Sequence, residues 1–342
     1  MVEAQKGSIP VIVMGLGQIG RDIARAVLAS AELHLVGAVD HDSTLIGRPL
    51  VELLGAGSIG PATKNLNPSI QVSSELPAAL RRQKKVLVFQ ATGSRLSEVL
   101  DQLNQAIDLG CSVVSTCEEL AFPYLKYPDL AQRLDQRAQK AGVSILGTGV
   151  NPGFMMDRLV ATIGQMCQGI RHVKVQRVVD ALTRREALQK KIGAGLSESE
   201  FYELSEKDQI GHIGLVESAA LCALGLGLEC EEVEEEMVPV IAMESLVTAT
   251  RTFAPGQVVG MAQTAVVLNE GVEQVRLELT ISLAAENPGD RIFIDGDWPV
   301  EVEVKKGVPG DRATAHVVVH AAPRLMASQA GLLTALELPA GR

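Results

Sequence analysis

A glycine-rich segment between two apolar runs, residues 11–40, restricts this chain to few folds. Residues 11–14 are continuously apolar, which is typical of a strand buried on both faces of a parallel sheet. Gly15, Gly17 and Gly20 follow with the spacing G-x-G-x-x-G. In a strand–turn–helix unit the first glycine permits a tight turn, the second allows a pyrophosphate to approach, and the third lets helix pack on strand. This spacing therefore predicts a dinucleotide-binding turn.

The residues after the third glycine complete the same unit. Apolar residues recur from Ile19 at helical spacing, and a second apolar run, residues 33–39, ends in Asp40. A carboxylate at this position accepts hydrogen bonds from an adenosine ribose and repels a 2′-phosphate. The cofactor contacts expected from this unit are Gly15, Gly17, Gln18, Ile19, Gly20, Asp40 and His41.

The choice between the two nicotinamide cofactors depends on the residues around Asp40. Residues 41–47 contain no Arg or Lys, so the sequence favours NAD. NADP stays open, because His41 or Arg48 can reach a phosphate. The rival interpretation is a related fold that has lost its cofactor.

Length and composition exclude several classes of protein. The chain has 342 residues, enough for two domains, and its net charge of −10 argues against a nucleic-acid partner. Its five cysteines form no C-x-x-C pair, which indicates reduced thiols in a cytoplasmic protein. We find no apolar run long enough for a membrane span and no His and Cys spacing typical of a metal site.

Strand and helix patterns alternate through the first half of the chain and then stop. Apolar runs at residues 86–89, 113–114 and 143–146 alternate with helical patterns at 96–109 and 130–141. We therefore predict an α/β fold whose first domain, residues 1–150, is a Rossmann-type doubly wound parallel sheet.

The second half follows a different pattern and predicts a second, α+β domain, residues 151–322, with a largely antiparallel sheet. The expected elements are strands in 172–181 and 266–283, a helix at 211–225, a hairpin in 291–304, a strand at 313–319 and a helix at 323–336. The terminal segment, residues 323–342, is expected to pack on the first domain. An acidic stretch, residues 229–236, reads as a solvated turn.

Polar residues follow the strands at the edge where an open parallel sheet binds ligands. We expect the turns at 90–94 and 115–119 to contact the cofactor through Ala91, Thr92, Gly93, Thr116 and Cys117. Glu118 and Glu119 are the candidate general acid or base, because burial near a cofactor raises a carboxyl pKa towards neutrality. The alternative for this pair is an acid that stabilises a helix start.

Other polar residues compete for a role in the site. The loop at 190–195 closes over a ligand or is a basic surface turn, and His212 contacts substrate or is a core histidine. Asp180, with Arg184 and Arg185, lines the site or pairs at a sheet edge. Cys117 has no histidine nearby to activate it as a nucleophile.

Several longer motifs resemble those of one enzyme family. They are MGLGQIG at 14–20, STCEEL at 115–120, GTGVNPGF at 147–154, QKKIGAG at 189–195, GHIGLVES at 211–218, GDRATA at 310–315 and AGLLTALELP at 330–339. The chain thereby resembles the native NAD(P)-dependent amine dehydrogenases and 2,4-diaminopentanoate dehydrogenases, a branch of the dihydrodipicolinate reductase-like superfamily. The resemblance extends over nearly the whole chain.

This resemblance implies reversible reductive amination of small ketones or aldehydes with ammonia and a reduced nicotinamide. It implies an acid/base role for Glu118, with Glu119 as the other possibility, and contacts from Asn151 and Pro152 to the nicotinamide. Phe154, Asp180 and His212 are the expected substrate contacts. The family's fold also implies a homodimer formed through the sheet of the second domain.

Three alternatives are weighed against this hypothesis. Dihydrodipicolinate reductases carry adjacent histidines, which this chain lacks, and homoserine dehydrogenases have a lysine where Glu118 stands. A non-catalytic NAD-binding sensor is disfavoured, because the acidic residue and the glycine-rich turn are both retained.

Overall fold

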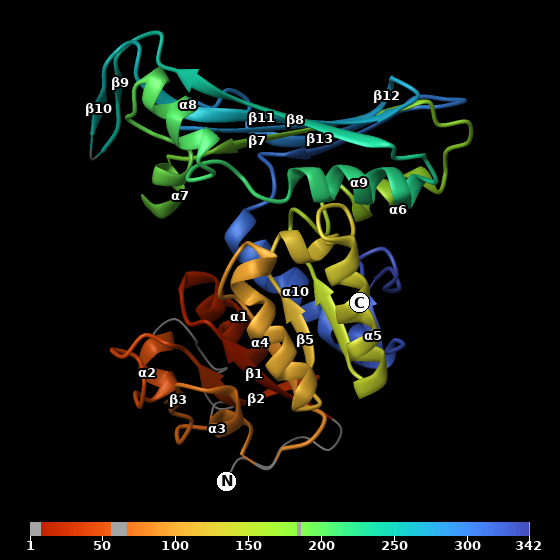
Figure 1. Cartoon of the computed structure of the whole chain (residues 1–342). Coiled ribbons are helices and arrows are strands. Elements are labelled where there is room, and N and C mark those ends of the chain that lie inside the picture. Colours follow the sequence, from red (N-terminus) through yellow and green to blue (C-terminus); the bar gives the residue numbers. More distant parts are fainter. Residues whose placement is uncertain (1–7, 56–66, 82, 183–185, 250, 342) are drawn as a thin grey trace. The chain divides into compact units, whose positions relative to one another are not determined.

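The computed structural model describes residues 8–55, 67–81, 83–182, 186–249 and 251–341. The chain forms two compact units, coloured along the sequence in Figure 1. Unit 1 comprises Met1–Phe154 and Pro309–Arg342, and unit 2 comprises Met155–Val308. Each unit contains a large sheet of its own.

Unit 1 is built on a seven-stranded sheet in which all neighbouring strands run parallel, in the order β15-β6-β5-β4-β1-β2-β3. Its strands are β1 (Ile9–Met14), β2 (Leu33–Val39), β3 (Val72–Ser73), β4 (Leu87–Gln90), β5 (Ser112–Ser115), β6 (Ser144–Gly147) and β15 (Gly331–Leu333). The central strands β4, β5 and β6 are buried along their whole length, which explains their continuous apolar runs.

Helices cover both faces of this sheet. The helices are α1 (Gln18–Leu28), α2 (Leu50–Leu54), α3 (Leu76–Leu80), α4 (Leu96–Asp108), α5 (Pro128–Ala141) and α10 (Gly310–Ala327), with a 3₁₀ turn, η2 (Glu119–Ala121). Val11 and Val13 of β1 pack in a core with α1, α2 and α10, whereas Ile12 and Met14 pack in a second core with α3, α4 and α5. The alternation follows from the period of two in a strand, and the predicted doubly wound fold is confirmed.

The C-terminal part of unit 1 differs from our prediction. The strand expected at 313–319 is wrong, because these residues lie inside the 18-residue helix α10. Its valines favour a strand locally, but Ala315, Val318 and Ala322 recur at helical spacing and are buried in the core with α1. The helix expected at 323–336 is also wrong: α10 ends at Ala327 and β15 follows at the sheet edge.

Unit 2 contains a six-stranded sheet in the order β14-β13-β7-β12-β11-β8 and a separate pair, β10-β9. The strands are β7 (His172–Asp180), β8 (Glu232–Ile241), β9 (Leu246–Val247), β10 (Thr252–Phe253), β11 (Val258–Asn269), β12 (Val272–Ser282), β13 (Gly289–Asp295) and β14 (Val300–Lys305). Every pair is antiparallel except β7 with β12, so the predicted largely antiparallel sheet is confirmed. The run expected at 266–283 is a hairpin, with positive φ at Glu270 and Gly271.

The helices of unit 2 are α6 (Arg158–Gly164), α7 (Glu186–Lys191), α8 (Glu198–Glu206) and α9 (Leu215–Leu226). In Figure 1, α6 and α9 lie along one face of the sheet, and α9 contacts β8, β11 and β12. On the other face of β7 and β12 most of the half-buried side chains are polar, and Lys174 Nζ lies 2.7 Å from Glu278 Oε1. None of the helices in the described part of the chain is long and apolar enough to span a bilayer.

Two further predictions in unit 2 need correction. The charged turn predicted at residues 229–236 is wrong, because Glu232–Ile241 is the edge strand β8. Repeated glutamates suit an edge strand, since their charge discourages pairing with another chain. The helix expected at 211–225 begins only at Leu215, so His212 lies in the turn before α9 and not on an apolar helix face.

Candidate active site

The turn between β1 and α1 requires glycine at two positions and leaves open space at a third. Gly15 has a φ of +86°, and a Cβ atom there would lie 2.4 Å from the carbonyl oxygen of Ala91. A Cβ atom at Gly20 would lie 1.7 Å from the carbonyl oxygen of Gly15. Around the corresponding position at Gly17, nothing lies within 4 Å. The turn is therefore tightly packed on its inner side and open at Gly17.

This open space lies at the N-terminus of α1. Gly17 is the N-cap residue of the helix, and no side chain caps it among the described residues. The Gln18 side chain points along the helix, where its Nε2 donates to Asp22 Oδ2 at 3.0 Å, and Ile19 packs against the core. Free N–H groups at a helix N-terminus attract anions, so the arrangement fits a pyrophosphate held by backbone.

Asp40 is fixed beside the same turn. Its side chain is largely buried at the end of β2, where Oδ2 accepts from the Leu16 N–H at 2.6 Å and Oδ1 accepts from the Asp42 N–H at 2.9 Å. Each carboxylate oxygen retains a second lone pair for a ribose hydroxyl. The neighbouring His41 side chain is 96% exposed, and Arg48 lies 3.6 Å from Glu52 in an ion pair.

A network of buried and half-buried side chains joins the turns after β4 and β5. Gln102 on α4 accepts through Oε1 from Gln90 Nε2 at 2.7 Å and from Thr92 Oγ1 at 2.5 Å. The Oε1 atom of Gln90 accepts from Ser115 Oγ at 2.6 Å, and Ser115 Oγ accepts from the Cys117 N–H at 3.0 Å. These contacts fix Thr92, an expected cofactor contact, relative to the turn that carries Glu118.

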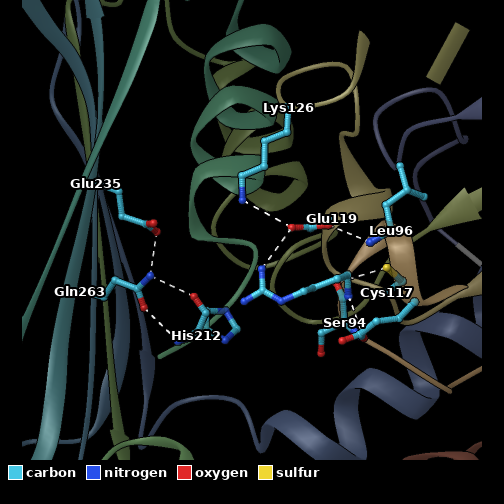
Figure 2. Close-up of polar contacts among 10 residues, drawn as sticks. Ser94, Leu96, Cys117, Glu119, Lys126, His212, Glu235 and Gln263 are labelled. Atoms are coloured by element: carbon cyan, nitrogen blue, oxygen red, sulfur yellow. Dashed lines mark hydrogen bonds and ion pairs between the residues drawn. The ribbon is translucent and has the colours of Figure 1, made fainter. Parts of the chain in front are cut away.

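Ser94 forms the second link between these turns. Its carbonyl oxygen accepts from the Cys117 thiol at 3.2 Å and from the Glu119 N–H at 3.3 Å, as Figure 2 shows for the thiol contact. Burial raises the pKa of the Cys117 thiol to about 12. The thiol therefore stays protonated near neutral pH and acts as a hydrogen-bond donor instead of a nucleophile.

Glu119 is buried and committed to the helix that follows β4. Only 1% of the residue is exposed, and its Oε2 accepts from the Leu96 N–H at the start of α4 at 2.7 Å (Figure 2). Its Oε1 lies 3.6 Å from Lys126 Nζ and 3.8 Å from Arg95 Nη1. This carboxylate thus satisfies an N–H that has no partner within the helix, which is a structural role.

Glu118 has a different environment. It is half-buried and stands directly before η2, where its own side chain makes no capping bond to that turn. Its negative charge contributes to the raised pKa of Cys117, so the two side chains are close. The turn after β5 therefore carries two adjacent carboxylates, of which Glu119 is buried and bonded to α4 and Glu118 is half-buried.

The turn after β6 carries Asn151, Pro152 and Phe154. The Thr148 N–H donates to the Ser115 carbonyl oxygen at 2.9 Å, which places this turn beside the one after β5. Asn151 and Pro152 are joined by a cis peptide bond, and Phe154 is 36% exposed. The turns after β4, β5 and β6 thus meet at the carboxyl edge of the parallel sheet, where ligands bind in this class of fold.

His212 in unit 2 is held through its backbone. Gln263 accepts from the His212 N–H at 3.2 Å and donates to its carbonyl oxygen at 2.9 Å and to Glu235 Oε1 at 2.7 Å (Figure 2). Burial and the nearby cations Lys191 and Arg177 lower the pKa of His212 to about 3. The imidazole is therefore neutral near pH 7 and can act as a neutral hydrogen-bonding group.

The other candidate residues of unit 2 are Asp180, Arg184 and Arg185 at the end of β7 and the loop at 190–195. Asp180 Oδ1 accepts from the Leu182 N–H at 2.9 Å, so it closes the end of β7, whereas Arg184 and Arg185 lie outside the described residues. The loop at 190–195 contacts the turn of His212, because the Lys191 carbonyl oxygen accepts from the Gly211 N–H at 2.9 Å. The motifs QKKIGAG and GHIGLVES, which 15 residues separate in the sequence, are thus in contact.

The sequence patterns did not reveal the hydrogen bond between Gln90 and Gln102 or a buried ion pair in unit 2. Arg177 Nη1 lies 2.7 Å from Asp290 Oδ1, with 5% and 2% of these residues exposed. Burial, the largest cause, raises the pKa of Asp290 although Arg177 opposes it. Gln90 could have been singled out because it is a polar residue at the end of an apolar strand. Its partner Gln102 could not be inferred from sequence spacing.

Comparisons with known proteins agree with this arrangement. A sequence model of the 2,4-diaminopentanoate dehydrogenase C-terminal domain matches residues 154–342, and one of the dihydrodipicolinate reductase N-terminus matches residues 9–115. The chain is 24% identical over 340 residues to 2,4-diaminopentanoate dehydrogenase of Acetoanaerobium sticklandii, which covers 98% of this chain and 94% of the relative. It is also 24% identical over 356 residues to an amine dehydrogenase of Streptomyces virginiae, covering 97% and 96%.

Solved structures show the same fold. An amine dehydrogenase from Mycobacterium smegmatis superposes with a TM-score of 0.83 at 21% identity, over 98% of this chain and 97% of that one. The WlbA dehydrogenase from Thermus thermophilus, in complex with NAD and UDP-GlcNAcA, gives 0.51 at 16% identity, over 96% and 93%. The predicted resemblance is confirmed. Because the C-terminal model covers more than half of its residues, this chain belongs to the 2,4-diaminopentanoate dehydrogenase family of oxidoreductases.

Proposed function

We propose that this protein is an NAD(P)-dependent amine dehydrogenase that reversibly aminates a small ketone or aldehyde with ammonia. The observation that carries the proposal is the position of Glu118, a half-buried carboxylate in the turn after β5, at the carboxyl edge of the parallel sheet. Membership of the family supports the reaction class, since its curated relatives carry the names amine dehydrogenase and 2,4-diaminopentanoate dehydrogenase.

Unit 1 is the proposed cofactor domain, with NAD preferred over NADP. The open space at Gly17 and the uncapped N-terminus of α1 fit a pyrophosphate, and the fixed carboxylate of Asp40 fits an adenosine ribose. Ala91, Thr92, Gly93, Thr116, Cys117, Asn151 and Pro152 complete the proposed contacts. The cofactor, when bound, supplies or accepts the hydride.

Glu118 is the proposed acid/base group. A carboxylate can hold ammonium near the carbonyl carbon, take up a proton as nitrogen attacks, and stabilise the positive charge of the iminium. Glu119 is a poorer candidate, because its Oε2 accepts from the Leu96 N–H and its Oε1 lies near two cations. We therefore assign a structural role to Glu119 and the acid/base role to Glu118.

Unit 2 is the proposed substrate and dimerisation domain. Neutral His212, whose backbone Gln263 holds, is a proposed substrate contact together with Phe154 and Asp180. The polar face of β7 and β12, with Lys174 and Glu278, is the proposed surface for a second copy of the chain. We place the enzyme in the cytoplasm, in keeping with cysteines that form no C-x-x-C pair.

A second candidate is 2,4-diaminopentanoate dehydrogenase activity, which the family's name suggests. Both candidates share the hydride transfer and the role of Glu118, and they differ in whether the substrate carries a carboxylate. A panel of simple amines and 2,4-diaminopentanoate, each assayed with NAD and NADP, separates them by relative kcat/KM.

The decisive experiment follows NADH oxidation with small ketones and aldehydes, with and without ammonia. We expect turnover that requires ammonia, and a loss of at least about 100-fold in kcat for Glu118→Gln with little change in NADH affinity. Glu75→Gln, at an exposed glutamate of unit 1, is the matched control. Turnover that ignores ammonia would make the protein a carbonyl reductase, and full activity of Glu118→Gln would refute the assigned role.

A further inference from the structure

Unit 1 has a pocket of about 400 Å³ that none of the proposed site residues line. One wall is a face of α10 with His316, His320 and Arg324, and the other is the C-terminal end of α1 with Ala26 and the segment up to Glu32. The glycine turn begins at the opposite end of α1. Eleven residues at ~1.5 Å each separate the two helix ends by roughly 16 Å, so the pocket is distinct from the dinucleotide turn.

The wall formed by α10 carries three side chains with nitrogen atoms that can donate hydrogen bonds. His316, His320 and Arg324 recur every four residues, so they project from one side of the helix. The two imidazole rings have centroids 6.2 Å apart, and all three side chains line the pocket. Among the described residues, no group of three His, Cys, Asp or Glu side chains could hold a metal ion, so these histidines lack the ligands of a closed metal site.

Arg324 indicates what the pocket binds. Its Nη1 donates to the Pro339 carbonyl oxygen at 3.4 Å, but its buried Nε has no hydrogen-bond partner. No described acidic side chain forms an ion pair with it, and burial lowers the pKa of the guanidinium. A buried N–H on a permanent cation costs free energy until an acceptor reaches it, and an anionic oxygen is the strongest such acceptor.

The wall formed by α1 sets the size and orientation of a ligand. Ala26 and Ala29 have short side chains, which leaves the space in front of the donors open. Glu32 is the one acid on the rim and is exposed. Its charge repels an anion, so an anionic group should bind beside Arg324 and not beside Glu32.

We propose that this pocket is a binding site for a small oxyanion, the phosphate or carboxylate group of a metabolite. Arg324 is the principal cation, and His316 and His320 donate further hydrogen bonds. The site does not depend on the proposed dehydrogenase activity, because it shares no residue with the proposed active site.

The test is thermal unfolding of the full chain in increasing potassium phosphate or potassium succinate, against potassium chloride at the same ionic strength. Samples are saturated with NADH, so that phosphate binding at the glycine turn does not contribute. We expect a saturable rise in Tm with phosphate, succinate or both, and the more effective anion identifies the group recognised. Equal responses to all three salts would refute the site.

Variants locate the response. Arg324→Gln should weaken the apparent affinity at least about tenfold, and His316→Gln severalfold, whereas Arg133→Gln, at an exposed arginine of α5 that does not line the pocket, should leave it unchanged. Glu32→Gln should strengthen binding, because it removes the only acid on the rim. Wild-type affinity in both Arg324→Gln and His316→Gln would overturn the proposal. His316 is exposed, so that variant remains informative if Arg324→Gln does not fold.

Discussion

Glu119 accepts a hydrogen bond from the backbone N–H of Leu96 at 2.7 Å, and this contact joins the turn after β5 to the start of α4. The two residues are 23 positions apart in the sequence. Because the bond involves a carboxylate that is only 1% exposed, it is charge-assisted and shielded from water. This bond is the reason that we assign a structural role to Glu119 and propose the acid/base role for its neighbour Glu118.

Glu119→Gln is therefore expected to change stability and not chemistry. Replacing the carboxylate with an amide weakens the bond to Leu96 and removes the charge that faces Arg95 and Lys126, which should lower the free energy of unfolding by about 1–3 kcal/mol. Urea unfolding measures this loss. The folded variant should keep most of its kcat, and the reverse pattern, with normal stability and no turnover, would exchange the roles of Glu118 and Glu119.

Gln102→Leu should weaken cofactor binding although Gln102 is not itself a proposed contact. The change removes the acceptor shared by Gln90 and Thr92, so Thr92 loses its fixed position in the turn after β4. We expect the Kd for NADH to rise about tenfold, which is about 1.4 kcal/mol, as measured by fluorescence titration. Gln105→Leu makes the same substitution on the exposed side of α4 and should leave the Kd unchanged.

Asp40→Asn should reduce the preference for NAD over NADP. The amide oxygen can still accept from the Leu16 N–H, so the turn stays folded, but the charge that repels a 2′-phosphate is lost. We expect the ratio of kcat/KM for NADH to that for NADPH to fall about tenfold. Asp42→Asn, at an exposed acid two residues away, is the control, and an equal fall in that variant would contradict the role of Asp40.

His212 predicts a pH dependence of stability. Its pKa is lowered to about 3 in the folded protein, mainly by burial, from an ordinary value of 6.5. The stability that this neutral imidazole contributes is complete above pH 6.5 and is lost as the pH falls towards 3, because the unfolded chain then binds the proton. Wild-type Tm should therefore fall more between pH 7.5 and 5.5 than that of His212→Gln. His41→Gln, at a side chain that is 96% exposed, should behave as wild type.

Arg177 and Asp290 form a buried ion pair, so removing either side chain should destabilise the folded protein. Arg177→Met leaves the Asp290 carboxylate buried without its cation and removes a donor to the Val308 carbonyl oxygen, so we expect a loss of about 3–5 kcal/mol. Arg291→Met, which breaks the more exposed pair with Glu303 in the same sheet, should cost about 1 kcal/mol or less. Equal losses of unfolding free energy for the two variants in chemical denaturation would contradict the view that burial makes the Arg177–Asp290 pair the more costly one to break.

Local patterns were sufficient for the framework of unit 1. Continuous apolar runs identified the central strands of the parallel sheet, and the glycine spacing located the turn at residues 15–20. These features are readable because each depends on neighbouring residues: a strand buried on both faces must be apolar throughout, and a positive φ with a close backbone contact requires glycine.

The amino-acid pattern was thus enough to predict the sheet class, the glycine turn and the two carboxylates of the motif STCEEL. Long-range packing makes residues 313–319 helical, since burial against α1 outweighs the preference of valine for strands. The fold also brings Glu119 to the backbone N–H of Leu96 and the Gln90 side chain to that of Gln102, and each pair forms a hydrogen bond. Those pairings join segments far apart in the chain, and no local spacing encodes which distant donor reaches a buried acceptor.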